Sequence, residues 1–265
     1  MSRSTFHVDP AYQPAMREIG LDADAVFTHP DIKVWRSITE RENCTLDATL
    51  TDGTRVRWHV KRFRATAGGA NGTSPALQEV EGVRLLEEQQ VPTVKIVGYG
   101  EVADGRSFAI TEDLADFAAA DKLIESGAAT FDQLCAATAD LAGTLHDKAL
   151  HHRDLYLCHF FAKVEAGKVD LRLIDAGRVA RLPKWPFRGR WIVKDLSQFW
   201  YSALRLGVSE VQRRAWLERY ACRRGLPSPE PLRKAIERKV KSIARHDAKS
   251  SVKQPGRNVS IPTPR

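Results

Sequence analysis

The chain has 265 residues, of which 43% are hydrophobic and 28% charged, and its net charge is +8. This composition supports one large domain or two small lobes with a buried core, and it excludes a largely disordered protein. It contains no run of about 18 apolar residues and no apolar secretion signal near residue 1, so we expect a cytoplasmic protein.

The first part of the chain is predicted to form a small antiparallel sheet with one helix. Residues 34–64 have the pattern of strands, and a turn at 51–54 separates two alternating segments, which predicts a β-hairpin. A glycine-containing loop precedes the predicted helix, which ends before Pro92. The elements predicted in this part are strands at 45–50 and 56–63, a helix at 75–91, and strands at 94–97 and 107–111.

The second part is predicted to be mainly helical. Its elements are helices at 131–150, 193–206, 210–224 and 231–245, with an alternating strand at 169–175. Residues 247–265 are polar and contain proline, so we expect a loose segment there. We therefore predict an α+β fold with two lobes, and the expected boundaries are a nucleotide-binding lobe at 1–113, a catalytic lobe at 114–247 and a basic tail at 248–265.

Two short motifs in the second part give the clearest indication of chemistry. H-R-D-L at residues 152–155 follows a predicted helix, and D-A-G at residues 175–177 ends a predicted strand. This order is typical of the catalytic core of kinase-like phosphotransferases, in which one carboxylate orients the attacking hydroxyl and a second holds magnesium. We predict that Asp154 is the catalytic carboxylate, that Asp175 binds Mg²⁺, and that a hairpin brings them together. The structural neighbours expected beside them are His152 and Arg153.

The same pattern predicts three features upstream. A lysine on a strand of the small lobe should hold the phosphates of ATP, and Lys61 fits that position. A glutamate on the following helix should pair with this lysine, and Glu79 is preferred over Glu81 because it is nearer the helix start. Residues 109–114 should offer backbone groups to adenine, and the candidates are Glu112 and Leu114. Taken singly, Lys61 is equally compatible with an exposed strand lysine, and Glu79 with a solvated helix charge.

The motifs depart from those of an ordinary protein kinase. His159 stands five residues after Asp154, where asparagine is usual, and we interpret it as a second metal ligand, a phosphate donor or a structural residue. Ala176 replaces the phenylalanine of D-F-G, and no A-P-E motif follows. No glycine occurs between residues 36 and 50, so a glycine-rich phosphate loop is missing. These differences favour a small-molecule or glycolipid kinase over a regulated protein kinase.

The nine residues 152–160, H-R-D-L-Y-L-C-H-F, closely resemble the signature of the lipopolysaccharide kinase family, the Kdo and core-heptose kinases of Gram-negative bacteria. The resemblance extends from about residue 36 to about residue 206 and includes His159. It implies the two-lobed protein-kinase-like fold, the use of ATP and Mg²⁺, and transfer of the γ-phosphate to a sugar hydroxyl, of heptose or Kdo, in the lipopolysaccharide inner core. It also implies that Asp195 is a structural acid beneath the catalytic loop.

Positive charge is concentrated towards the C-terminus. Residues 213–265 contain 15 Lys or Arg and 4 Asp or Glu, whereas the rest of the chain has a net charge of −3. A second basic stretch at 181–190 contains Trp185 and Phe187, and Trp191 follows it; these rings are expected to stack on sugars, rest at a lipid interface or pack in the core. Under the resemblance, both stretches hold an anionic glycolipid at the acidic cytoplasmic face of the inner membrane, and no nucleic acid is expected. A solvated helix face with a loose tail is the alternative.

Two other functions stay open. The first is another kinase on the same fold, either a protein Ser/Thr kinase or a small-molecule phosphotransferase of the antibiotic-kinase type. The missing A-P-E motif argues against the former and the L-Y-L-C-H-F extension against the latter. The second is a pseudokinase or basic scaffold, against which the presence of Lys61, Asp154 and Asp175 argues.

Overall fold

The structure is a computed structural model that describes residues 4–65 and 72–253. The chain forms two compact units, one comprising Met1–Arg84 and Val94–Ala115, the other Leu85–Thr93 and Asp116–Arg265. The predicted single boundary at residue 113 is therefore too simple, because a short segment after the first helix belongs to the second unit. Within the described ranges, no helix is long and apolar enough to cross a membrane.

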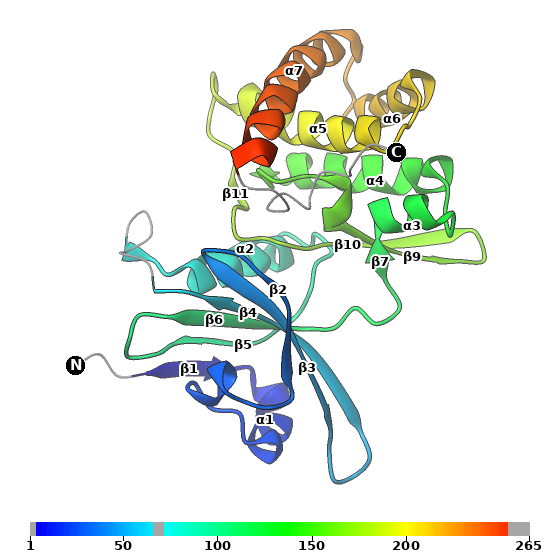
Figure 1. The fold of residues 1–265 in the computed structure, drawn as a ribbon. Coiled ribbons are helices and arrows are strands. Elements are labelled where there is room, and N and C mark those ends of the chain that lie inside the picture. Colours follow the sequence, from blue (N-terminus) through cyan, green and yellow to red (C-terminus); the bar gives the residue numbers. More distant parts are fainter. Residues whose placement is uncertain (1–3, 66–71, 254–265) are drawn as a thin grey trace. The chain divides into compact units, whose positions relative to one another are not determined.

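The first unit contains a six-stranded antiparallel sheet (Figure 1). Its strands, in spatial order, are β1 (Thr5–Val8), β5 (Ile96–Glu101), β6 (Ser107–Glu112), β4 (Arg55–Phe63), β3 (Arg41–Thr49) and β2 (Ile32–Ser37). The predicted hairpin is confirmed: β3 and β4 pair over nine residues, and Gly53 provides the positive φ of 84° that the turn requires. β4, which carries Lys61, has a neighbour on each side and is thus held on both edges.

The sequence prediction missed the start of this unit. β1 is followed by helix α1 (Gln13–Ile19) and by short 3₁₀ helices at Pro10–Tyr12 and Ala25–Phe27. β1 can lie close to β5 because Gly100 has no side chain; a Cβ there would be 2.1 Å from the backbone oxygen of Thr5. One face of the sheet buries a core with these N-terminal elements, including Met16, Val26, Leu46, Val60 and Phe108.

Helix α2 (Pro75–Glu88) starts in the first unit, where Ala76 and Val80 pack with Phe63 and Ala109. Its last residues and the segment up to Thr93 belong to the second unit. There, Leu173 donates its N–H to the oxygen of Pro92 at 2.9 Å, and the Thr93 hydroxyl donates to Leu173 O at 2.7 Å. The segment after α2 is therefore hydrogen-bonded to the end of strand β10 (Lys168–Leu173), two residues before Asp175.

The second unit is mainly helical, as predicted. Its helices are α3 (Ala120–Ser126), α4 (Phe131–Asp147), α5 (Arg188–Arg205), α6 (Glu210–Arg223) and α7 (Glu230–Lys253). Its short strands are β7 (Ala118–Ala119), β8 (Leu150–His151), β9 (Phe160–Glu165), β10 (Lys168–Leu173) and β11 (Ala180–Arg181), in two small sheets ordered β10-β9-β7 and β11-β8. Capping boxes at Thr130 and Ser209 begin α4 and α6.

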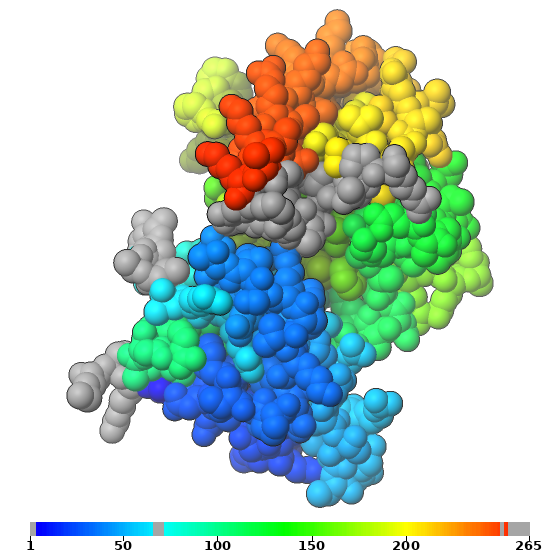
Figure 2. All heavy atoms as spheres, viewed as in Figure 1, coloured from blue at the N-terminus to red at the C-terminus, as the bar shows by residue number. Residues whose placement is uncertain are grey.

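Helix α5 is the centre of this unit, since residues 195–203 are all buried. The ring of Phe199 stacks on Trp216 of α6 at 4.0 Å between centroids. Helix α7 forms part of the surface in Figure 2 and extends to Lys253. The expected loose segment from residue 247 is thus wrong up to 253: Asp247 is buried and accepts a hydrogen bond from the Tyr201 hydroxyl at 3.0 Å. The rest of the predicted tail lies outside the described residues.

Candidate active site

The loop between β8 and β9 carries the H-R-D motif. Arg153 has a positive φ of 67°, which costs about 1–3 kcal/mol for a residue other than glycine and so has to be imposed by its surroundings. The next residue, Asp154, has a carboxylate that is 28% exposed and hence accessible to a reactant. Its Oδ1 accepts a hydrogen bond from Gln198 Nε2 at 3.3 Å, and Arg178 lies 3.9 Å from Oδ2.

Three polar residues on one stripe of α5 hold the backbone of this loop. Asp195 accepts hydrogen bonds from the N–H groups of residues 152 and 153, both at 2.7 Å. Gln198 accepts from the N–H of residue 155 at 3.2 Å, and Ser202 from that of residue 157 at 3.0 Å. Because the three side chains are buried in a packed helix, they fix the path of the loop on both sides of Asp154.

Asp195 is ionised within the protein interior. Burial alone would raise its pKa, but the hydrogen bond from His146, the proximity of His152 and the backbone N–H of residue 152 outweigh burial and lower it. His146 Nε2 is 3.4 Å from the Asp195 carboxylate, and its Nδ1 is 2.8 Å from the Tyr220 hydroxyl. Asp195 thus occupies the place beneath the loop that its predicted structural role requires.

Asp175 is brought next to the loop by a hairpin. β9 and β10 pair from Lys168 opposite Glu165 to Leu173 opposite Phe160, so the end of the loop meets the residues that follow β10. The N–H of Ile174 donates to His159 O at 3.1 Å, and His152 Nε2 donates to Ile174 O at 3.1 Å. Burial lowers the pKa of His152, so it serves here as a neutral structural donor. Asp175 has a positive φ of 61°, the second such residue of the motifs.

His159 links the two aspartates. Its Nδ1 lies 2.5 Å from the backbone oxygen of Asp154, and since a carbonyl only accepts, Nδ1 carries a proton. Its Nε2 is 3.4 Å from Asp175 Oδ2. Burial would lower its pKa, but Cys158 and the carboxylates of Asp175 and Asp154 raise it to about 10. A protonated His159 pairs with the Asp175 carboxylate, whereas binding a metal ion through Nε2 would require loss of the Nε2 proton.

In the first unit, the structure pairs the predicted lysine and glutamate. Lys61 Nζ donates to Glu79 Oε1 at 2.6 Å, and the side chains are 24% and 4% exposed. Glu81, the alternative partner, is exposed to solvent. A buried ion pair contributes little net stability, so this pair is weak evidence for a role in folding, and its role in holding ATP stays a prediction.

The predicted adenine-binding segment follows β6. Glu112 donates its N–H to Lys95 O at 3.0 Å within the sheet, and its carboxylate accepts from the Tyr12 hydroxyl at 2.5 Å. The Glu112 side chain is therefore engaged in the first unit, and any contact with adenine falls to the backbone of residues 112–114. The roles of Glu112 and Leu114 stay predictions.

Comparison with known proteins places these residues in one family. A sequence profile described as the lipopolysaccharide kinase (Kdo/WaaP) family matches residues 35–220. The chain belongs to this family. The match includes Lys61, Glu79 and the two motifs that contain Asp154 and Asp175, and it confirms the predicted resemblance together with the α+β kinase-like fold.

Individual relatives are enzymes of the Kdo/WaaP family. The chain is 31% identical over 159 residues to the lipopolysaccharide core heptose(I) kinase WaaP of Pseudomonas aeruginosa, a match covering 55% of this chain and 59% of the relative. It is 29% identical over 153 residues to the protein of that name from Escherichia coli K12, covering 52% and 56%. The chain thus spans less than two thirds of the length of these relatives.

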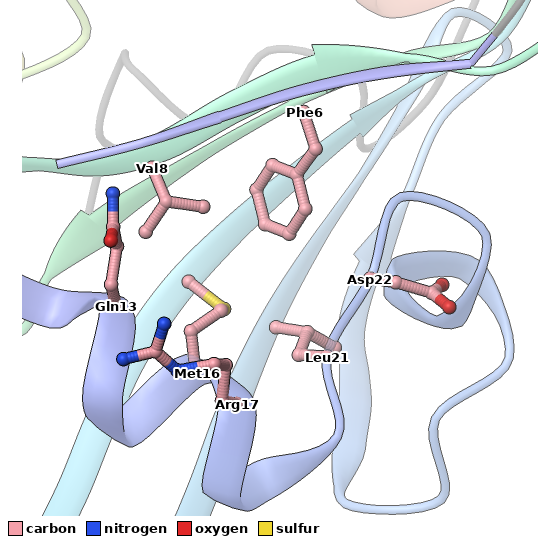
Figure 3. Close-up of a pocket in the computed structure, with 7 residues that line it drawn as sticks. All are labelled: Phe6, Val8, Gln13, Met16, Arg17, Leu21 and Asp22. Atoms are coloured by element: carbon pink, nitrogen blue, oxygen red, sulfur yellow. The ribbon is translucent and has the colours of Figure 1, made fainter. Parts of the chain in front are cut away.

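A pocket of about 290 Å³ is present in the first unit. Figure 3 shows apolar side chains from β1 and α1 facing it; the residues lining it are Phe6, Val8, Gln13, Met16, Arg17, Leu21 and Asp22. No predicted site residue is among them, and all precede the matched range. We therefore do not include this pocket in the candidate active site.

Sequence reasoning missed Gln198. This residue donates both to Arg153 O at 3.0 Å and to the carboxylate of Asp154, so it orients the side chain of the predicted catalytic residue directly. A signal was present: residues 195, 198 and 202 are polar at spacings of three and four, in a segment otherwise rich in large apolar side chains. Such a stripe in a buried helix indicates backbone groups that need partners.

Proposed function

We propose that this chain is an ATP-dependent kinase that phosphorylates a sugar hydroxyl, of heptose or Kdo, in the inner core of lipopolysaccharide. The observation that carries the proposal is the half-buried Asp154 carboxylate, held by α5 beside the Asp175–His159 pair in a member of the Kdo/WaaP family. Both relatives are named core heptose(I) kinases, which favours heptose over Kdo as the acceptor.

Each residue has a defined task in this reaction. Asp154 accepts or orients the proton of the sugar hydroxyl, and Gln198 holds its carboxylate in place. Lys61, fixed by Glu79, holds phosphate oxygens of ATP, and the backbone of residues 112–114 contacts adenine. Positioning of the two reactants supplies most of the rate in phosphoryl transfer, which is why the loop is so firmly held.

The donor atoms fit a magnesium site of the usual kind. Asp175 provides a hard carboxylate oxygen, and Mg²⁺ commonly uses one or two protein carboxylates together with substrate phosphates and water. When bound, the ion neutralises charge on the phosphates during transfer. His159 joins as a second ligand only in its neutral form; as a cation it stays a structural partner of Asp175.

The test is phosphate transfer from labelled ATP with magnesium. Purified inner-core lipopolysaccharide, a generic protein and an aminoglycoside are offered side by side. We expect label on the glycolipid. Label on the protein or the aminoglycoside alone would support one of the other kinase classes, and no transfer to any acceptor despite ATP binding would support a pseudokinase.

The Lys61–Glu79 pair provides a prediction with a matched control. Glu79→Gln removes the charge that fixes Lys61, and we expect kcat/KM for ATP to fall by about 10- to 100-fold, in line with about 1.5–3 kcal/mol for a hydrogen bond to a charged group. Glu81→Gln makes the same change on an exposed face of α2 and should leave kcat/KM within a factor of two. Equal effects of the two substitutions would contradict the assigned role of Glu79.

We also propose that residues 181–190 contact an acidic membrane surface, which would place the enzyme at the cytoplasmic face of the inner membrane. Trp185 is 89% and Phe187 63% exposed, so core packing is wrong for both rings. Basic side chains flank them, including Arg181 and Lys184. Exposed aromatic rings beside basic groups suit the interface of an anionic bilayer.

The membrane proposal is tested with vesicles. Trp185→Ala with Phe187→Ala should weaken binding to vesicles containing anionic phospholipid by about tenfold or more, because each ring buries apolar area in the interface. Trp35→Ala is the control, since Trp35 is 61% exposed on β2 of the first unit. Co-sedimentation measures both. Unchanged binding of the double variant would reject this surface.

A further inference from the structure

Four basic side chains gather at the start of α5. Trp191 is half-buried and stacks on His151 with 4.8 Å between ring centroids. The cationic groups of Arg153, Lys194 and Arg190 lie 4.8, 5.4 and 5.7 Å from the centre of its indole ring. The fourth side chain is Arg178, which contacts the catalytic carboxylate. We call these four basic residues and Trp191 the Trp191 cluster.

The positive charge of this cluster is not neutralised by the protein. In the described part of the chain, neither Arg190 nor Lys194 nor Arg153 has an ion-pair partner, and Arg178 reaches only Asp154, at 3.9 Å. Other arginines of the same unit are paired tightly, such as Arg223 with Asp147 at 2.8 Å. Like charges held together without a counterion repel one another. Binding of an anion to the cluster relieves this repulsion and is therefore favourable.

Two buried polar atoms next to the indole ring also lack partners. Arg153 Nε and His151 Nδ1 have no hydrogen bond to any described residue. Such groups are rare in folded proteins and usually have a role or an additional partner. Burial, followed by the proximity of Arg178 and Arg153, lowers the pKa of Lys194, which agrees with a site that has an excess of positive charge. The geometry and the unpaired Arg153 Nε–H donor both indicate an anionic ligand.

We propose that the Trp191 cluster binds an acidic group of the acceptor, a phosphate or a carboxylate that is separate from the phosphoryl group being transferred. This inference rests on the proposed kinase function. The cluster adjoins the reaction centre, because Arg153 precedes Asp154 in the chain and Arg178 contacts its carboxylate. Guanidinium groups bind both kinds of anion through paired hydrogen bonds. An acidic group held here would bring a neighbouring hydroxyl of the same acceptor to Asp154.

A binding experiment without nucleotide or metal tests the cluster independently of catalysis. Inorganic phosphate is titrated calorimetrically into the full chain, at low ionic strength, and acetate is titrated in parallel to represent a carboxylate. We expect Arg190→Gln with Lys194→Gln to weaken phosphate binding at least tenfold. The control, Lys239→Gln with Lys241→Gln, removes two exposed charges from α7 and should bind as the wild type does. Equal binding by the cluster variant and the wild type, or binding of neither phosphate nor acetate by the wild type, would overturn the proposal.

Kinetics then connect the subsite to the acceptor. For Arg190→Gln with Lys194→Gln, kcat/KM for the acidic core oligosaccharide should fall at least five times more than kcat/KM for neutral heptose, mainly through KM. Core oligosaccharide stripped of phosphate, or with reduced carboxyl groups, shows which acidic group is bound. Equal losses for acidic and neutral acceptors would reject the subsite. If no sugar is phosphorylated, the proposed function fails, whereas the phosphate titration still decides whether the cluster binds anions.

Discussion

Replacing Asp154 by asparagine is expected to lower the rate of phosphate transfer by about 10²- to 10⁴-fold, the range typical of a lost general base. The amide cannot accept the hydroxyl proton, but its oxygen still accepts the hydrogen bond from Gln198, so the loop keeps its shape. Single-turnover transfer from labelled ATP measures the chemical step directly. Folding is followed by circular dichroism and should be unchanged.

The matched control is Asp170→Asn, which makes the same chemical change on β10 at a side chain that is 54% exposed. Its transfer rate should stay within a factor of two of the wild type. If Asp154→Asn retained more than a tenth of the wild-type rate, a different group would have to orient the hydroxyl, and the assignment of Asp154 would be wrong.

The second large effect is expected on stability. Asp195→Ala removes the acceptor of two backbone N–H groups at 2.7 Å and leaves both without a partner beside α5. Each unsatisfied buried group costs about 1–3 kcal/mol, so we expect the free energy of unfolding to fall by about 2–5 kcal/mol. Urea unfolding measures this change. Transfer activity should fall as well, because the loop that carries Asp154 loses its support.

The pH dependence of the free energy of unfolding shows whether the negative charge of Asp195, and not only the size and shape of its side chain, stabilises the fold. The pKa of Asp195 in the folded state lies below its ordinary value of 3.8, so its stabilising contribution is complete above that pH and is lost as the pH falls through the folded pKa. The stability difference between wild type and Asp195→Asn should therefore be constant from about pH 5 to pH 8 and shrink below about pH 4. A difference that stayed constant at acidic pH would show that charge is not involved.

The alternation of apolar and polar residues predicted much of the secondary structure, and the two short motifs predicted which residues come together in most of the candidate site. The β3–β4 hairpin follows from alternation around a turn, and the Asp154–Asp175 arrangement from two motifs and the strand between them. β1 was missed because it has four residues and depends on the close approach to Gly100, which no local pattern reveals. Gln198 was missed because its role lies in a tertiary contact 44 residues away in sequence.

The end of α7 shows the same limit. The polar composition after residue 247 predicted a loose segment, but Asp247 is buried against Tyr201, and this contact belongs to a helix that continues to Lys253. Propensity is a weak indicator where a single tertiary hydrogen bond and helix packing decide the outcome. The unpaired charges of the Trp191 cluster were likewise invisible in sequence, where 181–190 showed only a basic and aromatic stretch.

Residues 85–93 belong to the second unit although they lie between two segments of the first, and this affects how the chain can be cut into fragments. A fragment ending at 113 would retain Leu86 and Val91, which are 0% and 2% exposed in the whole chain, and would lose Leu173, the backbone partner of that segment. On the ribosome, the same segment emerges about 80 residues before its partner strand. Until then its apolar side chains are exposed to solvent. We therefore expect chaperones to bind this short segment during synthesis, rather than the strands of the β-sheet that precede it.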